Sequence, residues 1–170
     1  MGFTHYYRFH KAKVETETRR EIFSDIAEEI KLFYGSLPRH STSGGDYYSD
    51  YPIVIRGGLG KGKPIINESQ IWFNGDESKG MDHETFSIEW NIDGNEDIDD
   101  PFEFCKTARK PYDLLVCVSL ISFTRHFNRN VFRASSDGKM EDWKHAIEFY
   151  NEIVDFDATE IVAKIISGEG

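Results

Sequence analysis

The run Leu114–Phe123 constrains the fold of this chain more than any other feature, because it is apolar on every side of a helix. A helix that is hydrophobic all round has no face to offer to water, so the run predicts a buried central helix. The segment just before it, Phe104–Asp113, carries three cations together with a thiol, a hydroxyl, a phenol and a carboxylate. Polar groups this dense in the first turn of a buried helix indicate a site built into the core.

The length and composition predict one compact domain over residues 1–170. An aromatic content of 14% argues against disorder. No apolar run reaches the roughly 20 residues of a membrane span, and the first residues lack the pattern of a secretory signal. Cys105 and Cys117 form neither a disulfide framework nor a zinc pattern. We therefore expect free thiols in a reducing cytoplasm, which is the host cytoplasm if a phage encodes the chain, and no metal or cofactor.

The net charge of −10 is concentrated in one segment. Residues 76–103 hold eleven acids and one base, so this segment alone accounts for it. Direct nucleic-acid binding is not expected, because phosphate contacts need a basic face. Two interpretations stay open. The segment is a solvated acidic loop, or it imitates the charge of DNA and binds the nucleic-acid groove of a basic host protein.

The pattern of apolar residues predicts an α+β fold. We expect a mainly antiparallel sheet of about five strands, packed by three or four helices, with the buried helix at the centre. Capping boxes at Thr18–Glu21 and Asp157–Glu160 mark two helix starts, and Pro111 suits the first position of the central helix. The predicted strands are 3–10, 51–56, 69–74, 85–91 and 130–134, and the predicted helices are 18–35, 111–123, 140–154 and 157–166.

Two segments resemble known ligand-binding motifs, but each lacks residues that the motif requires. Gly57–Lys63 fits the first seven positions of a P-loop, but Pro64 stands where Ser or Thr must hold magnesium, and a strand pattern follows instead of a helix. A hairpin, or a glycine loop that closes over a ligand, is expected there. Residues 93–97 begin like a calcium loop, yet Ile98 and Phe104 occupy the positions that need Gly and Glu.

The loop before the central helix is the strongest candidate for an anion site. Lys106, Thr107, Arg109 and Lys110 lie near a helix N-terminus, where backbone N–H groups and the helix dipole favour negative charge. Arg109 can hold a phosphate or carboxylate in a fork. The alternative is a basic loop that neutralises the neighbouring acidic segment. A buried cation here needs a carboxylate partner, and Asp113 is the nearest candidate.

Two histidines add to this hypothesis. His5 and Tyr6 alternate along the first predicted strand, so one of them faces the core or a pocket. His83 and Glu84 open another strand, where the histidine is either a general base or a surface residue. No catalytic residue is assigned. The predicted ligand-binding residues are His5, Tyr6, His83, Glu84, Lys106, Thr107, Arg109, Tyr112 and Asp113.

A resemblance to known proteins rests on six strings of the sequence: Gly2–Tyr7, Phe73–Gly75, His83–Phe86, Phe104–Asp113, Ser135–Gly138 and Asp142–Trp143. Together they resemble a family of small uncharacterised proteins from bacteriophages and bacterial genomes. Members of that family often begin Gly-Tyr-Thr-His-Tyr-Trp, so Phe3 and Tyr7 are departures in this chain. The family has no established activity, so the resemblance implies no catalytic residues. It implies a phage setting, in which small acidic proteins often act against host defence.

Three hypotheses for the function follow. The first is a phage-type accessory or counter-defence protein that binds a small anionic, nucleotide-like ligand in a polar pocket. The second is an enzyme acting on a nucleotide or phosphorylated substrate, with His5 or His83 as acid or base, Lys106 and Arg109 stabilising negative charge, and Cys105 as the nucleophile. The third is an acidic inhibitor that binds a basic host protein. Homo-oligomerisation is compatible with each of them.

Overall fold

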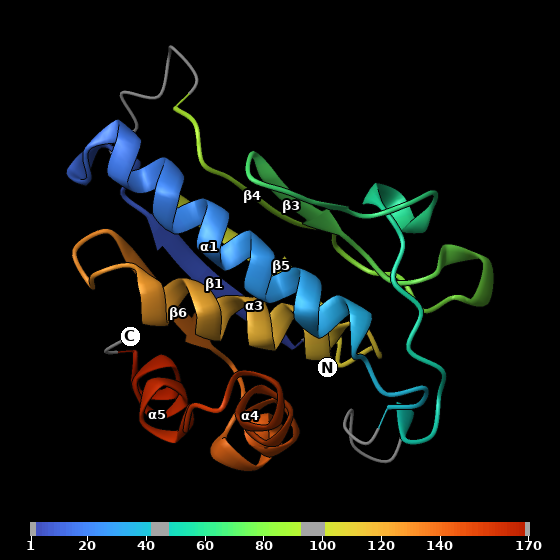
Figure 1. The fold of residues 1–170 in the computed structure, drawn as a ribbon. Coiled ribbons are helices and arrows are strands. Elements are labelled where there is room, and N and C mark those ends of the chain that lie inside the picture. Colours follow the sequence, from blue (N-terminus) through green and yellow to red (C-terminus); the bar gives the residue numbers. More distant parts are fainter. Residues whose placement is uncertain (1–2, 42–47, 93–100, 169–170) are drawn as a thin grey trace.

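The computed structural model describes residues 3–41, 48–92 and 101–168. These residues form an α+β fold in which helices pack on two antiparallel sheets (Figure 1). The first sheet has the strand order β5-β1-β6 and the second has the order β2-β3-β4. The strands are β1 Thr4–Phe9, β2 Ile65–Ile66, β3 Gln70–Phe73, β4 Phe86–Glu89, β5 Phe102–Lys106 and β6 Phe132–Ser136.

The α+β class is confirmed, but the prediction of one sheet of about five strands is wrong. The described residues contain two three-stranded sheets. Residues 51–56 form only isolated bridges, His40 with Pro52 and Arg56 with Asn74. The end of the acidic segment becomes strand β5, because its residues pair with β1 across about a hundred positions of sequence. Pairing over such a distance leaves no local signal in the sequence.

The central helix α3, Asp113–His126, is buried as predicted, since every residue from Asp113 to Phe123 is buried. The first sheet lies behind it in Figure 1, and α1 crosses in front of it. None of the helices in the described ranges combines the length and apolarity that a membrane crossing requires. The other helices are α1 Thr16–Gly35, α4 Met140–Val154 and α5 Thr159–Ser167.

Helix α1 begins two residues before the predicted capping box. The carboxylate of Glu15 accepts the backbone N–H groups of Glu17 and Thr18, so Glu15 satisfies the donors that a helix start leaves open. Helix α4 spans Met140–Val154, as its apolar stripe predicted. The difference at α1 has a simple cause, because any side-chain oxygen that reaches the first-turn N–H groups can cap a helix.

Aromatic rings join β1, α3 and β6 in the core. The Phe123 ring lies 5.2 Å from that of Phe132, and the Phe9 ring lies 5.9 Å from Phe132 and 6.2 Å from Phe123. Each such pair contributes about 0.5–1.5 kcal/mol beyond the burial of its surface. This cluster fixes the inner face of the first sheet against α3.

The central strand β1 has two different faces. His5, Tyr7 and Phe9 point inward and are buried, whereas Tyr6 and Arg8 point outward. This alternation follows from the two-residue period of a strand. It places one set of candidate residues in the core and another set on the solvent side of the sheet.

Candidate functional site

A polar network in the core connects β1, α3 and β6. His5 Nε2 lies 2.7 Å from Asp113 Oδ1, and His5 Nδ1 lies 2.9 Å from Ser136 Oγ. Thr107 Oγ1 donates to the same Asp113 oxygen at 2.6 Å. Asp113, the predicted carboxylate partner of a loop cation, pairs with His5 instead, and the loop residue Arg109 pairs with Asp142.

The hydrogen bonds around Ser136 determine the tautomer of His5. Ser136 Oγ accepts the N–H of Gly138 at 3.0 Å and the indole N–H of Trp143 at 3.3 Å. Both lone pairs of the hydroxyl are then in use, so its proton goes to His5 Nδ1. His5 therefore donates from Nε2 to Asp113, and all three side chains are satisfied.

This chain of a serine, a histidine and an aspartate contains the residue types of a nucleophilic triad, but its geometry supports a structural role. The ring nitrogens are exchanged relative to the serine-protease arrangement, because Nδ1 rather than Nε2 faces the hydroxyl. Ser136 Oγ retains no lone pair for attack. His5 is 0% exposed. The network holds strands and helix together, and its histidine is closed to a substrate.

Cys117 completes this network and makes it a candidate metal centre. Its Sγ lies 3.4 Å from Asp113 Oδ2 and 3.7 Å from His5 Nε2, so three ligand types meet. A structural zinc site takes four ligands, and here the three donors already exchange hydrogen bonds. Burial and the nearby Asp113 raise the pKa of the Cys117 thiol, which opposes the thiolate that a metal needs. The geometry favours the protonated network.

Asp113 is a buried carboxylate kept ionised by its partners. Burial alone would raise its pKa, but the interaction with His5 and the hydrogen bonds from His5, Thr107 and Cys117 together lower the pKa below its ordinary value. Loss of any of these donors would leave a buried charge without full compensation. The residue therefore contributes to the stability of the folded state.

A second group of predicted residues ties β5 to the segment before β4. The backbone N–H of Lys106 donates to Glu84 Oε2 at 2.6 Å, and the hydroxyl of Tyr112 donates to the carbonyl of Glu84 at 2.6 Å. Cys105 Sγ donates to the same carbonyl at 3.4 Å. Burial raises the pKa of the Cys105 thiol, so it stays protonated and is a poor nucleophile.

The loop cations have internal partners. Arg109 forms an ion pair with Asp142, and its guanidinium lies 4.2 Å from the centre of the Phe3 ring. Lys110 Nζ donates to the carbonyls of Gly80 at 2.9 Å and Asp82 at 2.8 Å. These contacts anchor the loop to the rest of the molecule and use donors that an anion would need.

The turn that carries Arg109 has an unusual backbone. Ala108 and Arg109 have φ values of 53° and 61°, in the left-handed region that residues with a Cβ rarely adopt. Each such residue costs about 1–3 kcal/mol unless its surroundings hold it. The ion pair with Asp142 and the contact with Phe3 supply that restraint on one side of the turn.

The remaining predicted residues do not join these networks. His83 is exposed, and its backbone exchanges hydrogen bonds with the side chain of Asn74. Tyr6 lies on the solvent side of the first sheet. The structure thus brings together His5, Thr107 and Asp113 in one group and Glu84, Lys106 and Tyr112 in another, and it places Tyr6, His83 and Arg109 apart from both.

The other sequence motifs have mainly structural roles. Gly57–Lys63 leads into strand β2 rather than into a helix, as the strand pattern after it predicted. The calcium-like residues 93–97 lie outside the described residues. In the acidic segment, Asp76 is buried, caps the short 3-10 helix Glu77–Lys79 and lies 3.7 Å from Arg56. Five further acids of that segment lie outside the described residues: Asp93, Glu96, Asp97, Asp99 and Asp100.

The solvent side of the first sheet carries a concentration of aromatic and basic side chains that the sequence analysis missed. We call it the outer face. It contains three aromatic residues and three cations, and at its edge the hydroxyl of Tyr6 donates to Asp137 Oδ1 at 3.0 Å. Across the strands, Phe104 lies opposite Tyr6, and Phe102 lies opposite Arg8. Its members are Phe102, Phe104 and Lys106 on β5, Tyr6 and Arg8 on β1, and Arg133 and Ser135 on β6.

The aromatic rings form a continuous strip over β1 and β5. The rings of Tyr6 and Phe102 are 6.0 Å apart and nearly parallel, and those of Phe102 and Phe104 are 6.1 Å apart. Phe102 is 37% exposed and Phe104 is 52% exposed. Exposed apolar patches that are rimmed by polar residues mark interaction sites in many proteins.

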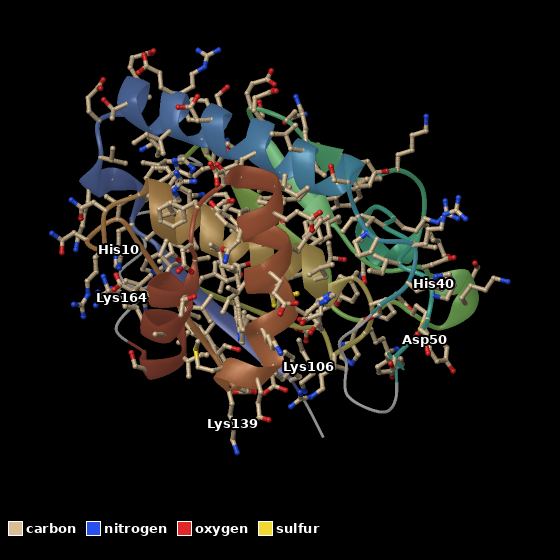
Figure 2. The ribbon with its side chains drawn as sticks, turned by 60° about the horizontal axis from the view of Figure 1, so that its bottom comes forward. His10, His40, Asp50, Lys106, Lys139 and Lys164 are labelled. Carbon is tan, nitrogen blue, oxygen red and sulfur yellow. The ribbon has the colours of Figure 1, made fainter. Side chains whose placement is uncertain are left out.

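The cations lie at both ends of this strip. Arg8 and Arg133 are direct cross-strand partners, and the guanidinium of Arg8 lies 4.8 Å from the Phe102 ring centre. Lys106 lies at the other end, at the close of β5, on the lower side of the molecule in Figure 2. A hollow of about 200 Å³ opens beside the two arginines, lined by Tyr6, Tyr7, Arg8, Arg133, Ala134, Ser135 and Gly168.

A sequence signal for the outer face did exist. Tyr6 and Arg8 alternate with buried residues on β1, and Phe102 and Phe104 alternate with Glu103 and Cys105 on β5. An alternation that places aromatic residues on both faces of a strand indicates that neither face is simply solvated. The second alternation was overlooked because it lies at the end of the acidic segment.

No family model, curated protein or solved structure matches this chain. The resemblance to an uncharacterised phage family therefore stays a prediction.

Proposed function

We propose that this protein binds a nucleotide-like anion on its outer face. A phosphate lies between Arg8 and Arg133, and a flat ring lies on the strip formed by Tyr6, Phe102 and Phe104. The observation that carries the proposal is the direct opposition of the two arginines beside exposed aromatic rings. Nucleotides combine the two chemical groups that such a surface recognises.

The arginine pair supports an anion rather than an apolar partner. An anion held between two guanidinium groups interacts favourably with both of them. Arginine also presents its donors in a planar fork that matches phosphate oxygens. These cations belong to a chain whose net charge is −10, so they are a local exception to its overall charge.

The size of the hollow fits part of a ligand. Its volume of about 200 Å³ is below the roughly 300–1,000 Å³ of sites that enclose a whole small molecule. A phosphate can enter the hollow while the ring remains outside, on the aromatic strip. In the phage setting that the resemblance implies, such a protein would withdraw a signalling nucleotide from the host.

Calorimetry against nucleoside monophosphates, the matching nucleosides and inorganic phosphate tests the proposal. We expect the monophosphates to bind more tightly than either fragment, and Arg133→Ala to weaken that binding at least about tenfold, which is about 1.4 kcal/mol. Arg129→Ala is the matched control, because Arg129 is also exposed and lies outside the outer face. The proposal fails if no monophosphate binds or if both variants bind equally well.

The same samples separate binding from catalysis. His5, Cys105 and Cys117 are buried, so we expect the ligand to be recovered unchanged. Mass spectrometry of a nucleotide incubated with the protein for several hours measures this directly. A product that forms with the protein and not with buffer alone would support the enzymatic alternative.

A further inference from the structure

The outer face provides more contact positions than a mononucleotide can use. We infer that its ligand is a short single-stranded segment of nucleic acid, of two or three nucleotides, an inference that rests on the proposed function. Two separate observations carry it: the number of adjacent exposed rings, and the distance between the cations at the two ends of the strip.

The first observation is the number of adjacent exposed rings. Tyr6, Phe102 and Phe104 lie next to one another, with centres about 6 Å apart in each successive pair. A mononucleotide has one base and can cover only part of this strip. Consecutive unpaired bases of one strand can stack on successive rings, and this mode of binding tolerates different sequences because every base has a flat face.

The spacing of the cations gives the second argument. Arg8 lies opposite Phe102, and Lys106 lies opposite Thr4, so four residues of β1 separate the two rows. At about 3.4 Å per residue these rows are about 14 Å apart. A single phosphate would meet cations at both rows only if both side chains extended toward each other across the rings that lie between them. Two phosphates of one strand can do so while their bases occupy the rings between them.

The charge of the rest of the chain limits the length of the segment. With a net charge of −10, the protein repels any strand that extends beyond the outer face. A duplex also fails to fit, because its bases are paired and cannot lie on the aromatic strip. The outer face therefore selects a short unpaired segment, in contrast to the expectation from net charge that nucleic acid is not bound at all.

A length series tests this inference. Oligothymidylates and oligouridylates of one to six nucleotides, and a DNA duplex as a comparison, are titrated into the protein by calorimetry. We expect affinity to rise at least tenfold between one and three nucleotides, to level off beyond three, and to be absent for the duplex. If mononucleotides bind and added length gives no gain, the inference is overturned and the proposed function stands. If nothing binds, both fail.

Two substitutions identify the cause of the length effect. Phe104→Ala should remove most of the gain between one and three nucleotides, about 5- to 150-fold for one lost stacking contact. Lys106→Ala should weaken the trinucleotide and leave the mononucleotide unchanged. Tyr34→Ala and Lys164→Ala are the controls, since both side chains are exposed on helices α1 and α5. A length effect that survives Phe104→Ala and Lys106→Ala in a protein that melts like the wild type contradicts the inference.

Discussion

Arg8 on β1 and Arg133 on β6 lie directly opposite each other across an antiparallel strand pair. Both residues point to the outer face, so an anion there can contact two guanidinium groups at once. The inner side of the same sheet is packed in the core and does not take part in this contact.

Arg133→Glu should therefore affect stability and binding in opposite directions. The new carboxylate faces Arg8, so we expect the free energy of unfolding to rise by about 0.2–1 kcal/mol. The same change should abolish nucleotide binding by placing a negative charge beside the hollow. Urea unfolding and calorimetry give the two values, with Arg129→Glu as the control. A variant that loses stability, or one that still binds, would contradict this interpretation of the arginine pair.

The Asp113 network predicts a large loss of stability on truncation. Asp113→Ala removes the acceptor of His5, Thr107 and Cys117 together, so we expect the free energy of unfolding to fall by about 3–5 kcal/mol. Asp25→Ala, on the exposed side of α1, should change it by less than about 0.5 kcal/mol. Equal losses in the two variants, measured by urea unfolding, would show that the network contributes little.

The stability of the protein should fall in acid. Partners lower the pKa of Asp113 despite its burial, and hydrogen bonds from His126, Tyr150 and Ser122 lower that of Glu29 in the same way. A carboxyl whose folded pKa is depressed stabilises the fold above its unfolded pKa, which is about 3.9 for Asp and 4.3 for Glu. This contribution disappears as the pH falls through the folded pKa values. Urea unfolding between pH 7 and pH 3 measures the decline.

Glu29→Gln separates the two carboxyl groups in that experiment. The amide keeps the shape of Glu29 and cannot titrate, so the decline below about pH 4 should be shallower than in the wild type. At neutral pH the variant should lose about 1–3 kcal/mol, because a charged acceptor shared by three side chains becomes a neutral one. An unchanged pH dependence would mean that Glu29 has the same pKa in the folded and unfolded states.

Gly75→Ala should be poorly tolerated. A Cβ at this position would lie 2.0 Å from the carbonyl oxygen of Met81 and 3.0 Å from the Tyr112 ring. Backbone cannot move aside as a flexible side chain does, so we expect a loss of at least about 1–3 kcal/mol. Gly35→Ala, at the end of α1, meets nothing within 4 Å and should not lower stability. Comparable melting temperatures for the two variants would contradict the packing described here.

The two cysteine thiols should not react with thiol reagents in the folded protein. Cys105 and Cys117 are buried, and burial raises the pKa of both, so neither reactive thiolate nor access is available. A thiol reagent such as 5,5′-dithiobis(2-nitrobenzoate) should label neither residue under native conditions and both after unfolding in urea. Rapid native labelling of one cysteine would show that the core around it opens far more easily than its packing indicates.

The elements predicted well from the sequence are those specified by local patterns. The apolar run of α3 and the apolar stripe of α4 each repeat within a few turns, and both helices formed as expected. Strand β5 was missed because its pairing with β1 depends on residues distant in the chain. Helix α1 starts earlier than predicted because Glu15, and not Thr18, accepts the backbone N–H groups of its first turn.

In the candidate site, too, single residues could be predicted from the sequence but contacts between distant residues could not. His5 and Asp113 were both named from the sequence, but their contact joins residues 108 positions apart, and nothing local predicts it. Ser136 entered only through the resemblance, although it completes the network. Arg8, Phe102, Phe104 and Arg133 were not predicted as binding residues, since their common location becomes visible only when the register of three strands is known.

The alternation along β1 links the accuracy of folding to function. Its inward residues complete the core and its outward residues belong to the outer face, so the two roles interleave one residue at a time. A slip of one residue against β5 or β6 would turn Arg8 into the core and His5 toward solvent. A form with the wrong register would therefore lose the packing of the core and the outer face together. Correct pairing of β1 is a condition for ligand binding as well as for folding.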